Sequence, residues 1–146
     1  VDEGAGVDVS FYVSGSKSGK SGPHRGVSVF GGDLVNSGST HTHGAVYWEI
    51  PLSEAGTYNV TDSDYLVQAD ASSGPVQVNL PAVALSKGRV LVINDANGQA
   101  GSNNITIEPS GAETINGASN FVMNQNGMCV TILSTGPAWT VIGKNL

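Results

Sequence analysis

Short stretches in which apolar and polar residues alternate, separated by turn-forming residues, recur along most of this chain. A period of two is the pattern of half-buried β-strands, whereas an amphipathic helix repeats its apolar residues every three or four positions. Glycine or proline stands in most of the gaps and supplies the backbone angles that a reversal needs. From residue 45 onward the predicted strands are Ala45–Ile50, Thr57–Val60, Asp64–Ala69, Val76–Leu80, Arg89–Asn94, Asn104–Glu108, Asn120–Asn124, Met128–Ser134 and Trp139–Ile142.

We expect these strands to form an all-β fold, an antiparallel β-sandwich similar to a jelly roll, because they are short and closely spaced. The pair Asn97-Gly98 is typical of a hairpin turn. Valine outnumbers leucine by 18 to 8, glycine accounts for 20 of 146 residues, and only 12% of residues are charged. Such a composition excludes an all-helical or doubly wound α/β fold, and the one helical turn expected is Pro81–Ser86.

Composition divides the chain into an arm, residues 1–44, and a body, residues 45–146. The arm holds 10 of the 20 glycines but only 12 of the 57 hydrophobic residues, so it cannot bury a core of its own. Its strand-like runs are Val7–Val13, Gly26–Phe30 and Asp33–Val35, and a Gly/Ser tract, Ser14–Gly22, separates the first two. We expect these strands to pair with the body or with other copies of the chain.

Two sets of motifs resemble those of tail-fibre and tailspike proteins of tailed bacteriophages. The arm contains Val9-Ser-Phe-Tyr-Val-Ser-Gly-Ser-Lys17 and Arg25-Gly-Val-Ser-Val-Phe-Gly-Gly-Asp-Leu-Val-Asn-Ser-Gly38. The body contains Asp64-Tyr-Leu-Val67, Val76-Gln-Val-Asn-Leu-Pro81, Gly88-Arg-Val-Leu-Val-Ile-Asn-Asp95, Gly98-Gln-Ala100, Asn104-Ile-Thr-Ile-Glu-Pro109, Thr114-Ile-Asn-Gly117 and Trp139.

The resemblance implies a virion appendage that is a homotrimer, lies beside other tail proteins and supports or performs attachment to a host surface glycan. Trimerisation is also expected on physical grounds, because an arm of short strands gains a core only when copies wrap around each other. Two other functions stay open. The chain could be a fragment of a polysaccharide-degrading tailspike, or a monomeric carbohydrate-binding module of a secreted cellular protein.

The segment Thr40-His41-Thr42-His43-Gly44 is a candidate metal site. In an extended strand His41 and His43 point to the same side, so a trimer would offer six imidazoles around its axis. Six nitrogens suit an octahedral Fe(II), Ni(II) or Co(II) ion better than tetrahedral Zn(II). Phage fibre needles are known for such His-x-His iron sites, although there the motif stands in a slender terminal needle. The alternative is that both histidines are exposed or packed at the axis without metal.

Two further motifs suggest ligands but lack the required spacing. Ser14–Ser21 looks like a phosphate loop, but three residues rather than four separate its glycines and no helix follows. A flexible loop is the simpler reading, although Lys17, Lys20 and Arg25 could contact an acidic neighbour. Asp95-Ala-Asn97-Gly98 looks like a shortened calcium loop without the later acidic ligand.

The residues do not indicate an enzyme. The carboxylates Asp62, Asp64 and Asp70 lie too close together in the sequence to predict a glycosidase pair. Cys129 lies in the apolar run Met128–Leu133, where an inert buried thiol is expected. Of the adjacent rings Tyr47 and Trp48 one should enter the core, and Trp139 should close the sandwich.

Charge and hydropathy exclude two further classes of partner. A net charge of −6 would repel a phosphate backbone, so nucleic-acid binding is not expected. Apolar stretches are much shorter than the ~20 residues of a membrane-spanning helix. No secretory signal opens the sequence, so such a signal is absent or was removed, and a lone cysteine cannot form an internal disulfide. The short apolar stretches predict no membrane span, and the resemblance to phage tail proteins implies a protein of the virion.

Overall fold

The computed structural model describes residues 34–42, 44–48, 50 and 55–145. The chain divides into two units, residues 1–45 and residues 46–146. The expected strands Val7–Val13 and Gly26–Phe30 lie outside the described residues. Leu34 and Val35 form no strand and are exposed, so the expected strand Asp33–Val35 is wrong for these two residues. The amide of Asn36 forms a local turn instead, because its oxygen accepts a hydrogen bond from the Gly38 N–H at 3.0 Å.

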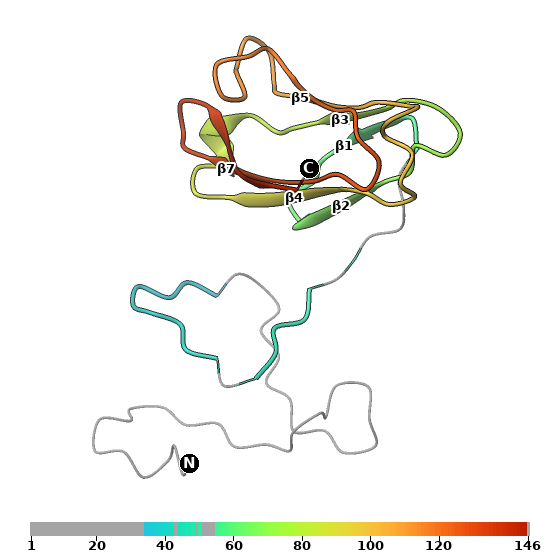
Figure 1. Ribbon diagram of the computed structural model, residues 1–146. Helices are drawn as coiled ribbons and strands as arrows, with labels where there is room; N and C mark the ends of the chain where they lie inside the picture. The colour runs from blue at the N-terminus through green and yellow to red at the C-terminus, as the bar shows by residue number, and fades with distance from the viewer. Residues whose placement is uncertain (1–33, 43, 49, 51–54, 146) are drawn as a thin grey trace, which may run out of the picture. The chain divides into compact units, whose positions relative to one another are not determined.

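The second unit consists of two four-stranded sheets that lie in two layers (Figure 1). One sheet has the order β1-β3-β5-β6 and the other the order β2-β4-β7-β8. A short 3₁₀ turn, η2, covers Val83–Leu85 and confirms the helical turn expected within Pro81–Ser86. The strands are β1 Thr57–Asn59, β2 Leu66–Ala69, β3 Val76–Asn79, β4 Val90–Asp95, β5 Ile105–Glu108, β6 Phe121–Met123, β7 Cys129–Ser134 and β8 Trp139–Lys144.

The all-β fold and its two layers are confirmed, but the antiparallel arrangement is wrong. Strands β1, β3 and β5 pair in parallel, and so do β2 and β4. Antiparallel pairing joins β5 to β6, β4 to β7, and β7 to β8. The reason is that successive strands from β1 to β5 alternate between the sheets, so each strand pairs with the next but one. The chain therefore winds through this part as a flattened solenoid.

This winding changes what the turns do. Asn97-Gly98 follows β4 in one sheet and precedes β5 in the other, so the expected hairpin turn is wrong. Gly98 has a φ of 65°, which glycine adopts without strain, and the turn carries the chain between layers. A hairpin does form at Thr135-Gly136-Pro137, between β7 and β8, with the Thr135 N–H donating to the Ala138 carbonyl at 2.9 Å.

The core lies between the two sheets and follows the period-two pattern. In β4 Leu91 and Ile93 are fully buried, whereas Val90 and Val92 on the outer face are half-buried. Each large buried side chain contributes about 1.5–3 kcal/mol through removal of apolar surface from water. Trp139 is fully buried, as expected of the residue that closes the sandwich. The largest fully buried side chains are Trp139, Leu91, Ile93, Ile105, Ile107, Ile115, Met123 and Ile132, with Val67, Val76, Val78 and Val130.

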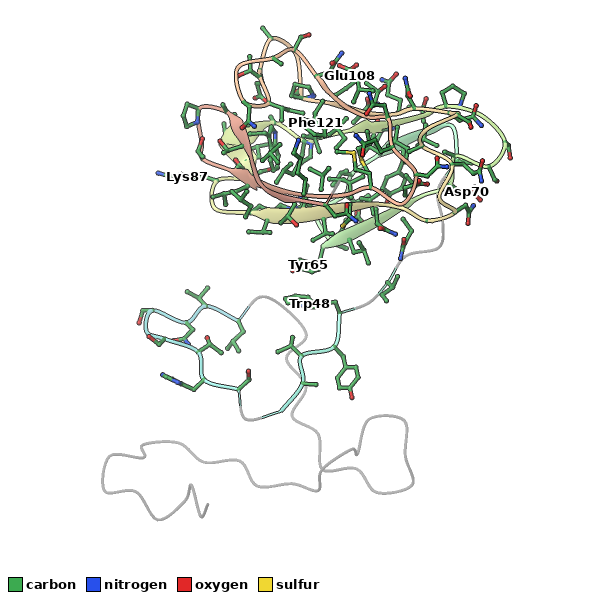
Figure 2. All side chains as sticks on the ribbon, viewed as in Figure 1. Trp48, Tyr65, Asp70, Lys87, Glu108 and Phe121 are labelled. Carbon is green, nitrogen blue, oxygen red and sulfur yellow. The ribbon has the colours of Figure 1, made fainter. Side chains whose placement is uncertain are left out.

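The residues before β1 depart from the prediction. Residues 45–48 and 50 form no strand, and neither ring of the Tyr47-Trp48 pair enters the core. Tyr47 is 88% exposed and Trp48 is 57% exposed. Trp48 instead stacks on Tyr65, with ring centroids 4.4 Å apart (Figure 2). A sequence that favours a strand is not sufficient here, because a strand also needs the edge of a neighbouring strand with which to form hydrogen bonds.

Among the described residues, no helix is sufficiently long and apolar to span a bilayer.

Candidate functional site

The expected metal residues are only partly described. His41 is exposed, and His43 lies outside the described residues. The paired-imidazole geometry therefore stays a prediction for a trimer. Within the described part of the chain, no group of three or more histidine, cysteine, aspartate or glutamate side chains is placed to hold a metal ion. The phosphate-like loop Ser14–Ser21, with Lys17, Lys20 and Arg25, also lies outside the described residues.

Asp95 serves as a hydrogen-bond acceptor for two loops. It is 4% exposed, and its carboxylate accepts backbone N–H bonds from Gln99 at 3.1 Å, Ala100 at 3.0 Å and Gly127 at 2.9 Å. Burial alone would raise the pKa of Asp95, but these backbone donors together lower it below its ordinary value. The carboxylate that suggested a calcium loop therefore ties the β4–β5 turn to the β6–β7 turn.

Three more aspartates, Asp62, Asp64 and Asp70, make contacts within or between turns. Asp64 accepts hydrogen bonds from the Tyr58 hydroxyl at 2.9 Å and from the Thr61 N–H at 2.7 Å. Asp70 accepts the Ser72 N–H at 2.9 Å, and hydrogen bonds from Ser72 lower its pKa. Asp62 is fully exposed, 3.8 Å from the guanidinium of Arg89. These contacts hold turns and do not form a two-carboxylate hydrolytic pair.

Cys129 is half-buried on the outer side of β7 rather than fully buried as expected. Burial raises the pKa of its thiol, so the thiol stays protonated near neutral pH and is a poor nucleophile.

A mainly polar surface covers the outer side of the β1-β3-β5-β6 sheet. We call it the ladder face. Strand register aligns its outward residues in two rows, one through Asn59, Asn79 and Glu108 and the other through Thr57, Gln77, Thr106 and Val122. These positions alternate with buried ones, so the core below fixes their direction.

Hydrogen bonds between side chains hold the ladder face in place. The Gln77 amide donates to the Asn79 oxygen at 2.8 Å, and the Asn79 amide donates to the Asn59 oxygen at 2.8 Å. At the β5–β6 side the Asn120 amide donates to Glu108 at 3.4 Å. Each amide keeps unused donor or acceptor capacity directed to solvent. The row is therefore an ordered set of polar groups on a rigid sheet.

Two adjoining hollows lie on this side of the unit. The larger, of about 320 Å³, is lined by residues of β1, β3 and β5, including Gln77, Thr106 and Glu108. The smaller, of about 210 Å³, is lined by Asp70 and by the Ser73-Gly74-Pro75 turn, and both hollows include Gly56 and Pro75. Glu108 lies on the opposite side of the unit from Tyr65 (Figure 2). The lining of the larger hollow offers amide, hydroxyl and carboxylate groups that donate or accept hydrogen bonds.

The ladder face was missed at the level of the sequence. Its residues were visible as the polar members of alternating strands, but Asn59, Asn79 and Glu108 are separated by 20 and 29 positions. Only the parallel pairing of β1, β3 and β5 brings them together.

No protein-family model matches this chain, and a search of curated proteins finds no match.

Proposed function

We propose that this chain is a structural and adhesive module of a bacteriophage tail fibre or tailspike. It acts as a homotrimer in the virion appendage, beside other tail proteins, and binds a host surface glycan at the ladder face. The observation that carries this proposal is the hydrogen-bonded row Asn59–Asn79–Gln77 beside the hollow lined by Glu108. The sequence motifs that resemble those of phage tail proteins support the proposed place in a virion tail appendage.

The chemistry of the ladder face suits sugar hydroxyls. A hydroxyl both donates and accepts a hydrogen bond, and the amides of Gln77 and Asn79 offer both functions while Glu108 offers a strong acceptor. The side chains are already ordered by mutual hydrogen bonds, so little conformational entropy is lost when a ligand binds.

Charge indicates the class of glycan. The larger hollow contains the carboxylate of Glu108, and the whole chain carries a net charge of −6. Like charges repel across a partly desolvated contact. We therefore expect neutral or amino sugars to bind in preference to sialylated or phosphorylated ones.

The hollow is at the small end of the range for ligand sites, about 300–1,000 Å³, so one site should bind weakly. Three copies in a trimer would compensate, because linked sites raise the apparent affinity by about 10²–10⁴. Its lining includes one carboxylate, Glu108, whereas hydrolysis of a glycosidic bond uses two. This supports binding rather than cleavage.

A glycan array probed with labelled protein tests the proposal. Gln77→Ala and Glu108→Gln should each lower binding at least tenfold. The matched controls are Gln125→Ala and Asp62→Asn, since both side chains are exposed and lie outside the lining of the hollows. Absence of binding to all host polysaccharides, or equal loss in the controls, would refute the role of the ladder face.

Two further measurements separate the alternatives. Incubation with host capsule polysaccharide should release no new reducing ends, and steady release would instead indicate a degrading tailspike fragment. Sedimentation should give about 45 kDa, three times 14.9 kDa. A mass of 14.9 kDa together with sugar binding would favour a monomeric carbohydrate-binding module.

A further inference from the structure

The outer side of the β2-β4-β7-β8 sheet differs in chemistry from the ladder face. We call it the uncharged face. Register aligns its outward residues as Leu66–Val92–Thr131, Val90–Leu133–Thr140 and Gln68–Asn94–Cys129. All nine side chains are half-buried and none carries a charge. A sheet face turned to water is normally polar with charges, so the uncharged face has the composition of a covered surface.

The β2 strand leaves this sheet open at one edge. It pairs with β4 on one side only. The Tyr65 and Ala69 carbonyls accept hydrogen bonds from the Val92 and Ala96 N–H groups, both at 2.9 Å. Because backbone groups alternate in direction along a strand, those of Leu66 and Gln68 point away from β4. An open edge of this kind can accept another strand.

The same chain carries a segment with the complementary chemistry. Val46, Tyr47, Trp48 and Ile50 are 54%, 88%, 57% and 62% exposed. Their sequence predicts a strand, yet residues 45–48 and 50 form none within the single chain. Trp48 already stacks on Tyr65, the residue that precedes β2. The segment and the open edge are therefore neighbours, and among the described residues neither has a partner strand there.

We propose that the uncharged face and the β2 edge form an interface between copies of this chain, in which Val46, Tyr47, Trp48 and Ile50 of one copy pack against β2 and β4 of the next. We take a second copy as the occupant because these apolar side chains stay exposed among the described residues of their own chain. A head-to-tail contact of this type closes into a ring when the rotation between copies allows it. The inference rests on the proposed homotrimer and gives it a contact surface, independently of glycan binding.

Sedimentation of the 146-residue protein at micromolar concentration tests the interface. The unchanged protein should sediment near 45 kDa, three times 14.9 kDa. Trp48→Ala and Val92→Lys should each weaken association at least tenfold and shift the mass toward 14.9 kDa. Trp48 is exposed, so its replacement leaves the fold intact. The matched control is Val122→Lys, since Val122 is an outward valine of the other sheet, 38% exposed, and its replacement should not alter the mass.

Cys129 supplies a native probe of the same surface because it stands in the Gln68–Asn94–Cys129 row. Alkylation by N-ethylmaleimide should be at least tenfold slower in the unchanged protein than in Trp48→Ala. Any one of three results would overturn the interface. The unchanged protein could sediment at 14.9 kDa, the Val92→Lys variant could associate fully, or Cys129 could be alkylated at equal rates in the unchanged protein and in Trp48→Ala. An unchanged protein that sediments near 45 kDa but binds no glycan would refute the ladder-face function and leave the interface standing.

Discussion

Replacement of Asp95 by alanine should destabilise the two-sheet unit more than replacement of any exposed aspartate. Three backbone N–H groups donate to this carboxylate, from Gln99, Ala100 and Gly127. A hydrogen bond to a charged group contributes about 1.5–3 kcal/mol when its donor is buried. Ala100 is fully buried, so its donor would be left without a partner. Gln99 and Gly127 are exposed and would regain water, at about 0.5 kcal/mol each.

Loss of the three hydrogen bonds should therefore lower the free energy of unfolding by about 3 kcal/mol in total. For a unit of about 100 residues this corresponds to a fall in melting temperature of roughly 12 °C or more. Urea denaturation followed by far-UV circular dichroism measures the change directly. Asp62→Ala is the matched control, because Asp62 is fully exposed and its contact with Arg89 is 3.8 Å long, so its loss should leave the transition essentially unchanged.

The pH dependence follows from the same contacts. The pKa of Asp95 is lowered in the folded state, so the unfolded chain binds its proton more readily. The stability that Asp95 contributes is therefore present above the unfolded pKa of about 3.9 and is lost as the pH falls through the folded value. Asp95→Ala should show a flatter loss of stability below about pH 4. A cost under about 1 kcal/mol, or an unchanged acid slope, would refute the view that this carboxylate joins the two turns.

Three further predictions concern the core, a tight contact and the histidine pair. Trp139→Ala should cost about 3–5 kcal/mol in urea unfolding. Trp139→Phe should cost less than half of that, because the buried indole N–H has no hydrogen-bond partner among the described residues; equal costs would contradict this. Gly101→Ala should lower the unfolding free energy by about 1 kcal/mol. The new Cβ would lie 2.7 Å from the Asn126 side-chain oxygen and would displace that oxygen, which accepts a hydrogen bond from the Gly101 N–H at 2.8 Å. An unchanged urea midpoint argues against the contact. If His41 and His43 line a trimer axis, elemental analysis of untagged protein should find one transition metal ion per trimer. The metal should be lost below about pH 6.5 and should be absent when both histidines are replaced by alanine. Less than about 0.1 metal ion per trimer argues against the site.

Strand positions were predictable because the signal is local. The alternation in β4 identified Leu91 and Ile93 as one face and Val90 and Val92 as the other, and only the first pair is fully buried. Strand ends agree with the prediction within about two residues from β1 to β8. The exception is residues 45–50, a mostly apolar run whose described residues form no strand, since strand formation also depends on an available neighbour.

Partner choice was not predictable from the same signal. The alternation of apolar and polar residues separates the two faces of a strand, but it does not predict which other strand lies beside it. The Asn-Gly pair at 97–98 is compatible with a reversal inside one sheet or a passage between two sheets, and the structure uses the second. The ladder face depends on that outcome, because hairpins would not have aligned Asn59 with Asn79 and Glu108.

The sequence by itself determined that the body is all-β, where most of its strands lie, and that Trp139 lies in the core. These properties follow from local backbone preference and from the burial of alternate side chains. Only the tertiary structure decided that β1 to β5 wind between two sheets, that Asp95 joins two turns, and that one outer face is a polar ladder while the other is uncharged. The contacts that decide these features join residues 20 or more positions apart, in the β1–β3, β2–β4 and β3–β5 pairs and between Asp95 and Gly127. The energy of such contacts depends on which strands become neighbours.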